Sequence, residues 1–169
     1  FIYTIYLKRI PILDIFTLSS FYLLRLIAGG VLFGITISNW LLTFSVFFFL
    51  FLASVKRWVE LNRTKKNYIS GRGYNIIDTP FITNLSYFAG LISVLVICLY
   101  IESQQALAIY DDSKLIWLMP VLLLYWILET LFNVGRNKVD DDPIKYALKS
   151  KSSYIFLLSF LALFVFVNI

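Results

Sequence analysis

The polar segment SVKRWVELNRTKKNYISGRGY, at residues 54–74, directly follows the strongly apolar run TFSVFFFLFLA. On a helix, its Lys56 and Glu60 lie four residues apart on one face, with Arg57 beside them. Arg72 lies between two glycines, which let backbone amides approach an anion closely, and its guanidinium offers phosphate a bidentate fork. The segment therefore predicts one wall of a phosphate site. The alternative is a set of interfacial cations that snorkel toward water beside an ordinary ion pair.

A second charged candidate, Arg25, lies inside the apolar stretch FYLLRLIAGG. It is about fourteen residues, or roughly 21 Å, from the basic end of its predicted helix. A charge at this depth is costly and usually faces a partner or a water-filled cavity, so we expect a functional role for Arg25. The alternative is a structural ion pair within the bundle, for which Glu129 in YWILET is the candidate partner.

The sequence VDDDPIKYALKSK places three consecutive aspartates, residues 140–142, directly before Pro143. They are suited to capping a short helix that begins at the proline. The alternative is a carboxylate cluster for Mg²⁺, a hard cation that prefers oxygen ligands and often bridges to diphosphate. The chain contains no His, which excludes a His general base and a His-ligated metal, and one Cys, which excludes an internal disulfide.

The candidate residues are embedded in a chain that is 60% hydrophobic and 18% aromatic, with a mean hydropathy of +0.81. This composition is far outside the range of soluble domains. A helix needs about 20 apolar residues to cross the hydrocarbon layer, and continuous rather than alternating apolar runs favour helices over barrel strands. The sequence therefore predicts an all-α, polytopic transmembrane helical bundle. Its five helices are expected at about residues 12–35, 40–61, 81–100, 115–134 and 154–169.

Every Lys and Arg except Arg25 and Lys114 falls on one side of this predicted bundle. The positive-inside rule makes that side cytoplasmic, so the net charge of +5 indicates topology rather than nucleic-acid binding. The same side would attract phosphorylated ligands and the anionic lipids of the bilayer. The chain opens with FIYTIYLKR, which reads as the end of an apolar segment entering a basic loop, so we expect a fragment of a longer integral membrane protein.

The ordered segments LKRIPILD, LRLIAGG, WLLTFSVFFFLFLASVKRWVEL, GRGY, LLLYWILE and DDPIKYAL resemble the second half of the UbiA-type membrane prenyltransferases. Within that family they are most similar to the polyprenyl-phosphate phosphoribosyltransferase branch. The resemblance covers nearly the whole chain and depends on several motifs in order. It implies that residues 1–169 form the C-terminal part of a single nine-helix domain, as its fifth to ninth helices. It also implies a bacterial inner membrane with the active-site loops in the cytoplasm.

The resemblance implies transfer of 5-phosphoribosyl from phosphoribosyl pyrophosphate to a polyprenyl phosphate, with Mg²⁺-assisted departure of pyrophosphate, in cell envelope biosynthesis. The family's second motif, a spaced pair of aspartates, falls on KRWVE, which makes Lys56, Arg57 and Glu60 the implied catalytic residues. Exchanging a carboxylate for cations removes metal ligands and adds anion ligands, which suits two phosphorylated substrates. The main Mg²⁺ motif of the family lies in earlier helices, so this chain alone is expected to be inactive.

The resemblance also implies a set of charged substrate-binding residues. Arg72 would bind phosphate or pyrophosphate together with Lys56 and Arg57, and Glu60 would orient a cation, Mg²⁺ or a ribose hydroxyl. Arg25 would hold an anionic group or organise the cavity. The full implied substrate-binding set is Arg25, Arg72, Lys8, Asp141 and Asp142.

Three other functions are compatible with the sequence. A prenyltransferase of the same family with an aromatic acceptor would use a prenyl diphosphate. A transporter in which Arg25 and Glu129 line a pathway is the alternative from another class, as is a noncatalytic scaffold whose basic face binds anionic lipid. The cluster of charges at one helix mouth favours the transferase.

Overall fold

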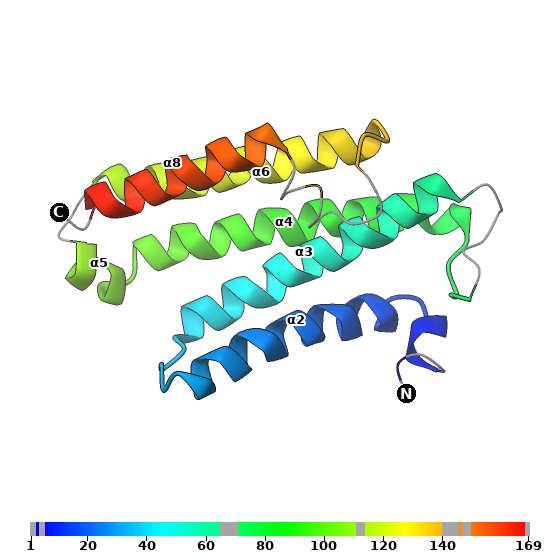
Figure 1. The fold of residues 1–169 in the computed structure, drawn as a ribbon, viewed down its shortest axis with the longest axis horizontal. Coiled ribbons are helices and arrows are strands. Elements are labelled where there is room, and N and C mark those ends of the chain that lie inside the picture. The colour runs from blue at the N-terminus through cyan, green and yellow to red at the C-terminus, as the bar shows by residue number, and fades with distance from the viewer. Residues whose placement is uncertain are drawn as a thin grey trace.

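The computed structural model describes residues 3, 6–64, 71–110, 114–139, 146 and 150–167, and within these ranges the regular elements are all helical (Figure 1). The apolar helices are α2 (Leu13–Leu32), α3 (Asn39–Arg63), α4 (Thr79–Ile101), α6 (Leu118–Gly135) and α8 (Lys151–Val167). The short elements between them are the 3-10 turns η1 (Leu7–Arg9), η2 (Ile76–Asp78) and η3 (Lys114–Trp117), and the helix α5 (Gln104–Tyr110).

Four helical stretches are long and apolar enough to cross a membrane, and α8, with 17 residues, is a shorter apolar helix. The four stretches are Leu13–Leu32, Asn39–Arg63, Ile76–Ile101 and Lys114–Gly135. The predicted fold class, a polytopic helical membrane bundle, is therefore confirmed. Which end of the bundle faces the cytoplasm stays a prediction.

Local signals explain where the helices differ from the expected ranges. The first helix ends at Leu32 because Gly34 follows it with a φ of +63°, a conformation that terminates helices and suits glycine. In the second helix, the side chain of Ser38 accepts a hydrogen bond from the Leu41 amide at 3.1 Å and caps the start. At the start of α4, Pro80 occupies a first-turn position, where its missing N–H costs nothing.

The helices run up and down in a layered order, with α3 packed between α2 and α4, and α6 packed between α4 and α8 (Figure 1). This order places the start of α2, the end of α3, the start of α4 and the end of α6 at one end of the bundle, called the charged end here. The indole of Trp126 donates a hydrogen bond to Ser153 Oγ at 3.0 Å and ties α6 to α8.

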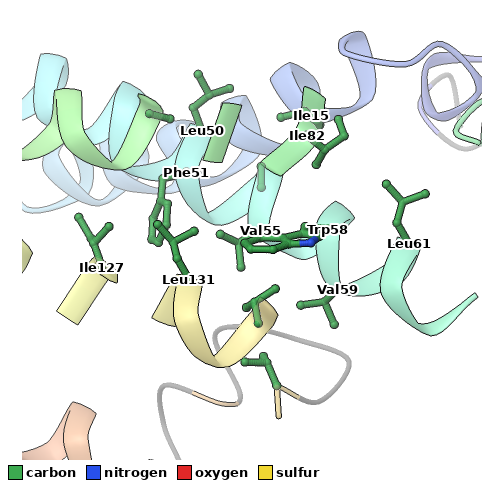
Figure 2. Packing of buried hydrophobic residues seen from close by; sticks show 14 of the residues in the cluster. Ile15, Leu50, Phe51, Val55, Trp58, Val59, Leu61, Ile82, Ile127 and Leu131 are labelled. Atoms are coloured by element: carbon green, nitrogen blue, oxygen red, sulfur yellow. The ribbon is translucent and has the colours of Figure 1, made fainter. Parts of the chain in front are cut away.

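The core lies where α3, α4 and α6 meet, and Figure 2 shows Phe51 and Val55 facing Ile127 and Leu131 there. Gly90 on α4 permits this close approach. A Cβ at position 90 would lie 2.8 Å from Ile127 Cγ2 and 3.2 Å from Phe51 Cδ2. Small residues have this role in membrane bundles, where helices associate through close packing.

Gly90→Ala should therefore destabilise the protein in detergent, by about 1–3 kcal/mol, because the added methyl overpacks the three-helix contact. Gly135→Ala is the matched control: its Cβ would meet Trp58 at an ordinary 3.8 Å, and alanine is the better helix former. Thermal unfolding of both variants checks the prediction. An equal decrease in Tm in both variants would contradict the prediction.

Candidate functional site

A buried ion pair joins α2 to α3 at the charged end. Arg57 Nε donates to Asp14 Oδ2 at 2.5 Å, and Arg57 Nη2 donates to Asp14 Oδ1 at 3.2 Å. The side chains are 1% and 0% exposed, respectively. Removing both charges from water is costly, so such a pair is stable only when its remaining donors and acceptors are also satisfied. Asp14 also lies in the first turn of α2, where the helix dipole favours a negative charge.

Glu60 and Arg72 complete a ring of four charges around this pair. Arg57 Nη1 donates to Glu60 Oε1 at 2.7 Å, and Arg72 Nη1 donates to Asp14 Oδ1 at 3.2 Å. Arg72 Nε lies 3.1 Å from Glu60 Oε2. The ring is electrically balanced. Asp14 and Arg57 form its closed side, whereas the side chains of Glu60 and Arg72 are 25% and 23% exposed and form its open edge.

One buried oxygen of Glu60 has an unused hydrogen-bonding capacity. Glu60 Oε2 is within ion-pair distance of Arg72 Nε, but among the described residues it accepts no hydrogen bond of good geometry. A buried acceptor without a donor is costly, so such an atom is suited to a donor supplied by a ligand.

The turn that precedes Asp14 is strained. Ile12 has a φ of +69°, and the Leu13 amide donates to the Pro11 carbonyl at 2.7 Å, which defines a γ-turn centred on Ile12. A positive φ is unfavourable for a β-branched residue and persists only where the surrounding structure enforces it. The Ile12 amide donates to the Tyr74 hydroxyl at 3.0 Å, which supplies that constraint.

The loop GRGY docks against this turn, and each of its residues has a distinct structural role. A Cβ at Gly73 would lie 2.1 Å from the Arg9 carbonyl oxygen, so only glycine fits there. Gly71 has a φ of +78°. The side chain of Tyr74 is 1% exposed, and burial raises its pKa to about 12. Arg72, between the glycines, is thereby held against Asp14 and Glu60.

The structure brings together three of the predicted site residues, Arg57, Glu60 and Arg72. The guanidinium of Arg57 is buried and directed at carboxylates and at Tyr3, so this geometry gives it a positioning role rather than direct contact with an anion. Lys56 is half-buried on the same turn of α3, and Lys8 is half-buried in η1. The predicted residues Asp141 and Asp142 lie outside the described residues.

Arg25 is not part of this ring. It lies eleven residues after Asp14 on α2, which is about 16 Å along the helix axis. The suggested pair with Glu129 does not form, because Arg25 is exposed on α2 and Glu129 belongs to α6, beyond α3 and α4 (Figure 1). Within the described part of the chain, the contact found for the Arg25 guanidinium is the Tyr22 ring, 5.7 Å from its centroid.

The sequence reasoning missed Asp14, Tyr74 and Tyr3. Tyr3 donates to Asp14 Oδ1 at 2.9 Å. Asp14 had a usable signal, because a lone carboxylate at the start of an apolar helix is a natural counter-ion for the excess of cations in KRWVEL. For the two tyrosines, nothing in the sequence distinguishes them from interfacial aromatic residues.

The described residues of the charged end do not provide a metal site by themselves. No group of three His, Cys, Asp or Glu residues that could hold a metal occurs within the described ranges. The ring carboxylates Asp14 and Glu60 are already bound to guanidinium groups, which would repel a divalent cation. The donor set described here therefore does not fit Mg²⁺.

An apolar cavity of about 460 Å³ lies at the opposite end of α3. Its lining includes Trp40, Phe44, Tyr100 and Phe160, and none of the described residues that line it is charged. Phe44 is thirteen residues before Arg57 on α3, about 20 Å along the helix axis. The ring of four charges and the apolar cavity therefore lie at opposite ends of α3.

Comparisons with known proteins identify relatives of different kinds. The chain is 31% identical over 156 residues to the uncharacterized protein y4nM of Sinorhizobium fredii. The aligned residues make up 90% of this chain and 30% of that protein. The chain is 29% identical over 154 residues to the nodulation protein NoeC of Azorhizobium caulinodans, covering 87% of this chain and 49% of that protein. The chain thus spans between about a third and a half of the length of these relatives.

Over shorter stretches, the chain has a higher sequence identity to two enzymes of one name. Over 54 residues, or 32% of this chain and 16% of the relative, the chain is 46% identical to decaprenyl-phosphate phosphoribosyltransferase of Corynebacterium glutamicum. The enzyme of the same name from Mycolicibacterium smegmatis is 43% identical over 60 residues, or 36% of this chain and 19% of that enzyme. No protein-family model matches the chain. The chain is thus a membrane protein with partial similarity to a phosphoribosyltransferase.

Asp14→Asn should lower the free energy of unfolding by about 3 kcal/mol or more, because it leaves the buried Arg57 without its full counter-charge. Glu102→Gln, at an exposed acidic residue at the end of α4, is the control and should change stability by less than about 0.5 kcal/mol. Chemical denaturation in detergent micelles measures both. Comparable effects of the two substitutions would contradict a buried, paired Asp14.

Tyr74→Phe should destabilise the protein by about 1–3 kcal/mol, because the Ile12 amide loses its acceptor. The effect should depend on pH. Folding favours the neutral hydroxyl, whose pKa rises from 10.0 to about 12, so its contribution is complete below pH 10 and is lost as the pH rises to about 12. The stability difference between the wild type and the variant should therefore shrink across this window.

The matched control is Tyr125→Phe, at a tyrosine that is 62% exposed on α6. Unfolding free energies measured at several pH values for all three proteins provide the comparison. A wild-type advantage over Tyr74→Phe that stays constant to pH 12 would show that the Tyr74 hydroxyl is not held in the buried, neutral state.

Proposed function

We propose that the chain is part of a UbiA-type membrane transferase that moves 5-phosphoribosyl from phosphoribosyl pyrophosphate to a polyprenyl phosphate. An oxygen of the lipid phosphate attacks the anomeric carbon. The bond from this carbon to pyrophosphate breaks, and pyrophosphate leaves with the electron pair. Because the nucleophile is already anionic at neutral pH, positioning and electrostatic stabilisation would carry the rate.

The open edge of the charge ring is the observation that carries this proposal. Arg72 offers guanidinium donors to a phosphate oxygen, and Glu60 Oε2 offers an unused acceptor to a hydroxyl. A phosphorylated sugar supplies both groups. A prenyl diphosphate has no sugar hydroxyl to donate to Glu60, so the ring favours the sugar phosphate. The 46% identity to part of a decaprenyl-phosphate phosphoribosyltransferase supports the same choice.

The roles of the other residues follow from their burial. Asp14 and Arg57 hold Glu60 and Arg72 in place from the closed side of the ring. Lys56 and Lys8 add positive charge at the same end, which would face the cytoplasm of a bacterial inner membrane. The family resemblance implies that the reaction needs Mg²⁺, and we assign no described residue as a ligand of this ion. We retain Asp141 and Asp142 as proposed substrate-binding residues.

The test uses the intact protein in detergent with Mg²⁺ and measures pyrophosphate release. Release should require both phosphoribosyl pyrophosphate and polyprenyl phosphate. Arg72→Lys should lower kcat/KM roughly 10- to 100-fold, because a charged hydrogen bond and the bidentate fork are lost. Arg136→Gln is the matched control, since this exposed arginine at the charged end contacts the Phe132 ring rather than the charge ring.

Three outcomes would contradict the proposal. Pyrophosphate release that requires only a prenyl diphosphate and an aromatic acid would retain the family and reject the phosphoribosyl donor. No release with either donor would favour a transporter. An equal loss of activity in Arg72→Lys and Arg136→Gln would reject the ring as the substrate site.

A further inference from the structure

Arg25 lies near the middle of a membrane helix, where a charge without a partner is costly. In the 20-residue helix α2 it is twelve residues from Leu13 and seven from Leu32, or about 18 Å and about 10 Å from the two ends. The residue is exposed. No hydrogen bond or ion pair of its guanidinium occurs within the described part of the chain.

The side chain of Arg25 points away from the nearer end of α2. Side chains on a helix lean toward its N-terminus. The Arg25 guanidinium lies over the ring of Tyr22, the residue one turn nearer to that end, with 5.7 Å to the centroid. Tyr22 is at the middle of α2, so the charge points toward the centre of the bilayer and away from the nearer end.

The Tyr22 ring does not compensate for this position. A cation–π contact at an exposed site is a weak interaction, whereas a charge at the centre of a membrane helix is costly and usually meets an opposite charge or a watered cavity. The guanidinium of Arg25 therefore needs an anionic or polar partner at its own depth.

The described residues leave the surface around Arg25 largely uncovered. Only 11% of the α2 span is buried, against 39–44% for the other three spans. The helix packs on α3 and η1, and the ring of its Phe21 meets the ring of Tyr3 edge to face, with 5.5 Å between the centroids. The exposed side that carries Arg25, Ala28 and Leu32 is called the Arg25 face.

We propose that the Arg25 face binds a transmembrane helix that carries an Asp or Glu at the depth of Arg25. Charge complementarity selects the carboxylate. A second copy of α2 is excluded as the partner, because it would bring another arginine against the first. Lipid phosphates lie at the membrane surface, from which the guanidinium points away. The rhizobial relatives contain polypeptide beyond the matched part, which could supply such a helix. The inference does not depend on the proposed reaction.

The first test asks whether the Arg25 face is covered, and it leaves Arg25 in place. In the intact protein with Cys98→Ser, a spin label is attached at Ala28→Cys in lipid bilayers, and its collisions with oxygen and with a water-soluble nickel complex are measured. Low accessibility to both reagents is expected. High oxygen accessibility would show lipid on this face, and high nickel accessibility would show a water-filled cavity; either result would overturn the proposal.

The second test identifies the partner by charge reversal. Arg25→Glu should lower the Tm of the intact protein by roughly 5 °C or more, and Arg25→Lys should lower it less. Replacing one Asp or Glu in the other membrane spans by Lys, in the Arg25→Glu background, should restore most of the loss. An unchanged Tm in Arg25→Glu, or no acidic position that restores it, would overturn the proposal.

Discussion

The buried ion pair between Asp14 and Arg57 is the interaction on which the charged end depends. It fixes the start of α2 against the end of α3, and its burial forces every remaining donor and acceptor of the two side chains to find a partner. Arg57 therefore binds Glu60 as well, and Asp14 also accepts from Arg72. At a protein surface the side chains of such a pair would be mobile. In the interior, Asp14 and Arg57 hold the partly exposed side chains of Glu60 and Arg72 in place.

This frame couples the charged loop to the helices. The GRGY loop reaches the ring only because Gly73 sits against the Arg9 carbonyl and Tyr74 holds the strained turn at Ile12. The strained residue is two positions before Asp14, so the same contact sets the turn, the start of α2 and the position of the carboxylate. Strain of this kind often accompanies functional sites, where a side chain must be placed against the local backbone preference.

The two arginines of interest show opposite ways of carrying a charge in a membrane helix. Arg57 is satisfied by carboxylates of its own chain, whereas Arg25 is exposed at the middle of α2 with an aromatic ring beneath it. The first arrangement holds the ring of four charges together, and the second marks the surface that we propose for association. Asp14, the partner of Arg57, lies about 16 Å from Arg25 along α2. A single phosphate therefore cannot contact both arginines.

The sequence alone determined the membrane class, the helices and most of the charged end, because long apolar runs and the one-sided distribution of Lys and Arg are local features of the chain. It also placed Lys56 and Glu60 on one helix face with Arg57 beside them, and in the structure Arg57 binds Glu60. Only the tertiary structure decided that Asp14, 43 residues from Arg57, is its counter-ion and that Arg25 does not meet Glu129. Contacts of this kind depend on how helices rotate and pack against one another, which periodicity does not specify.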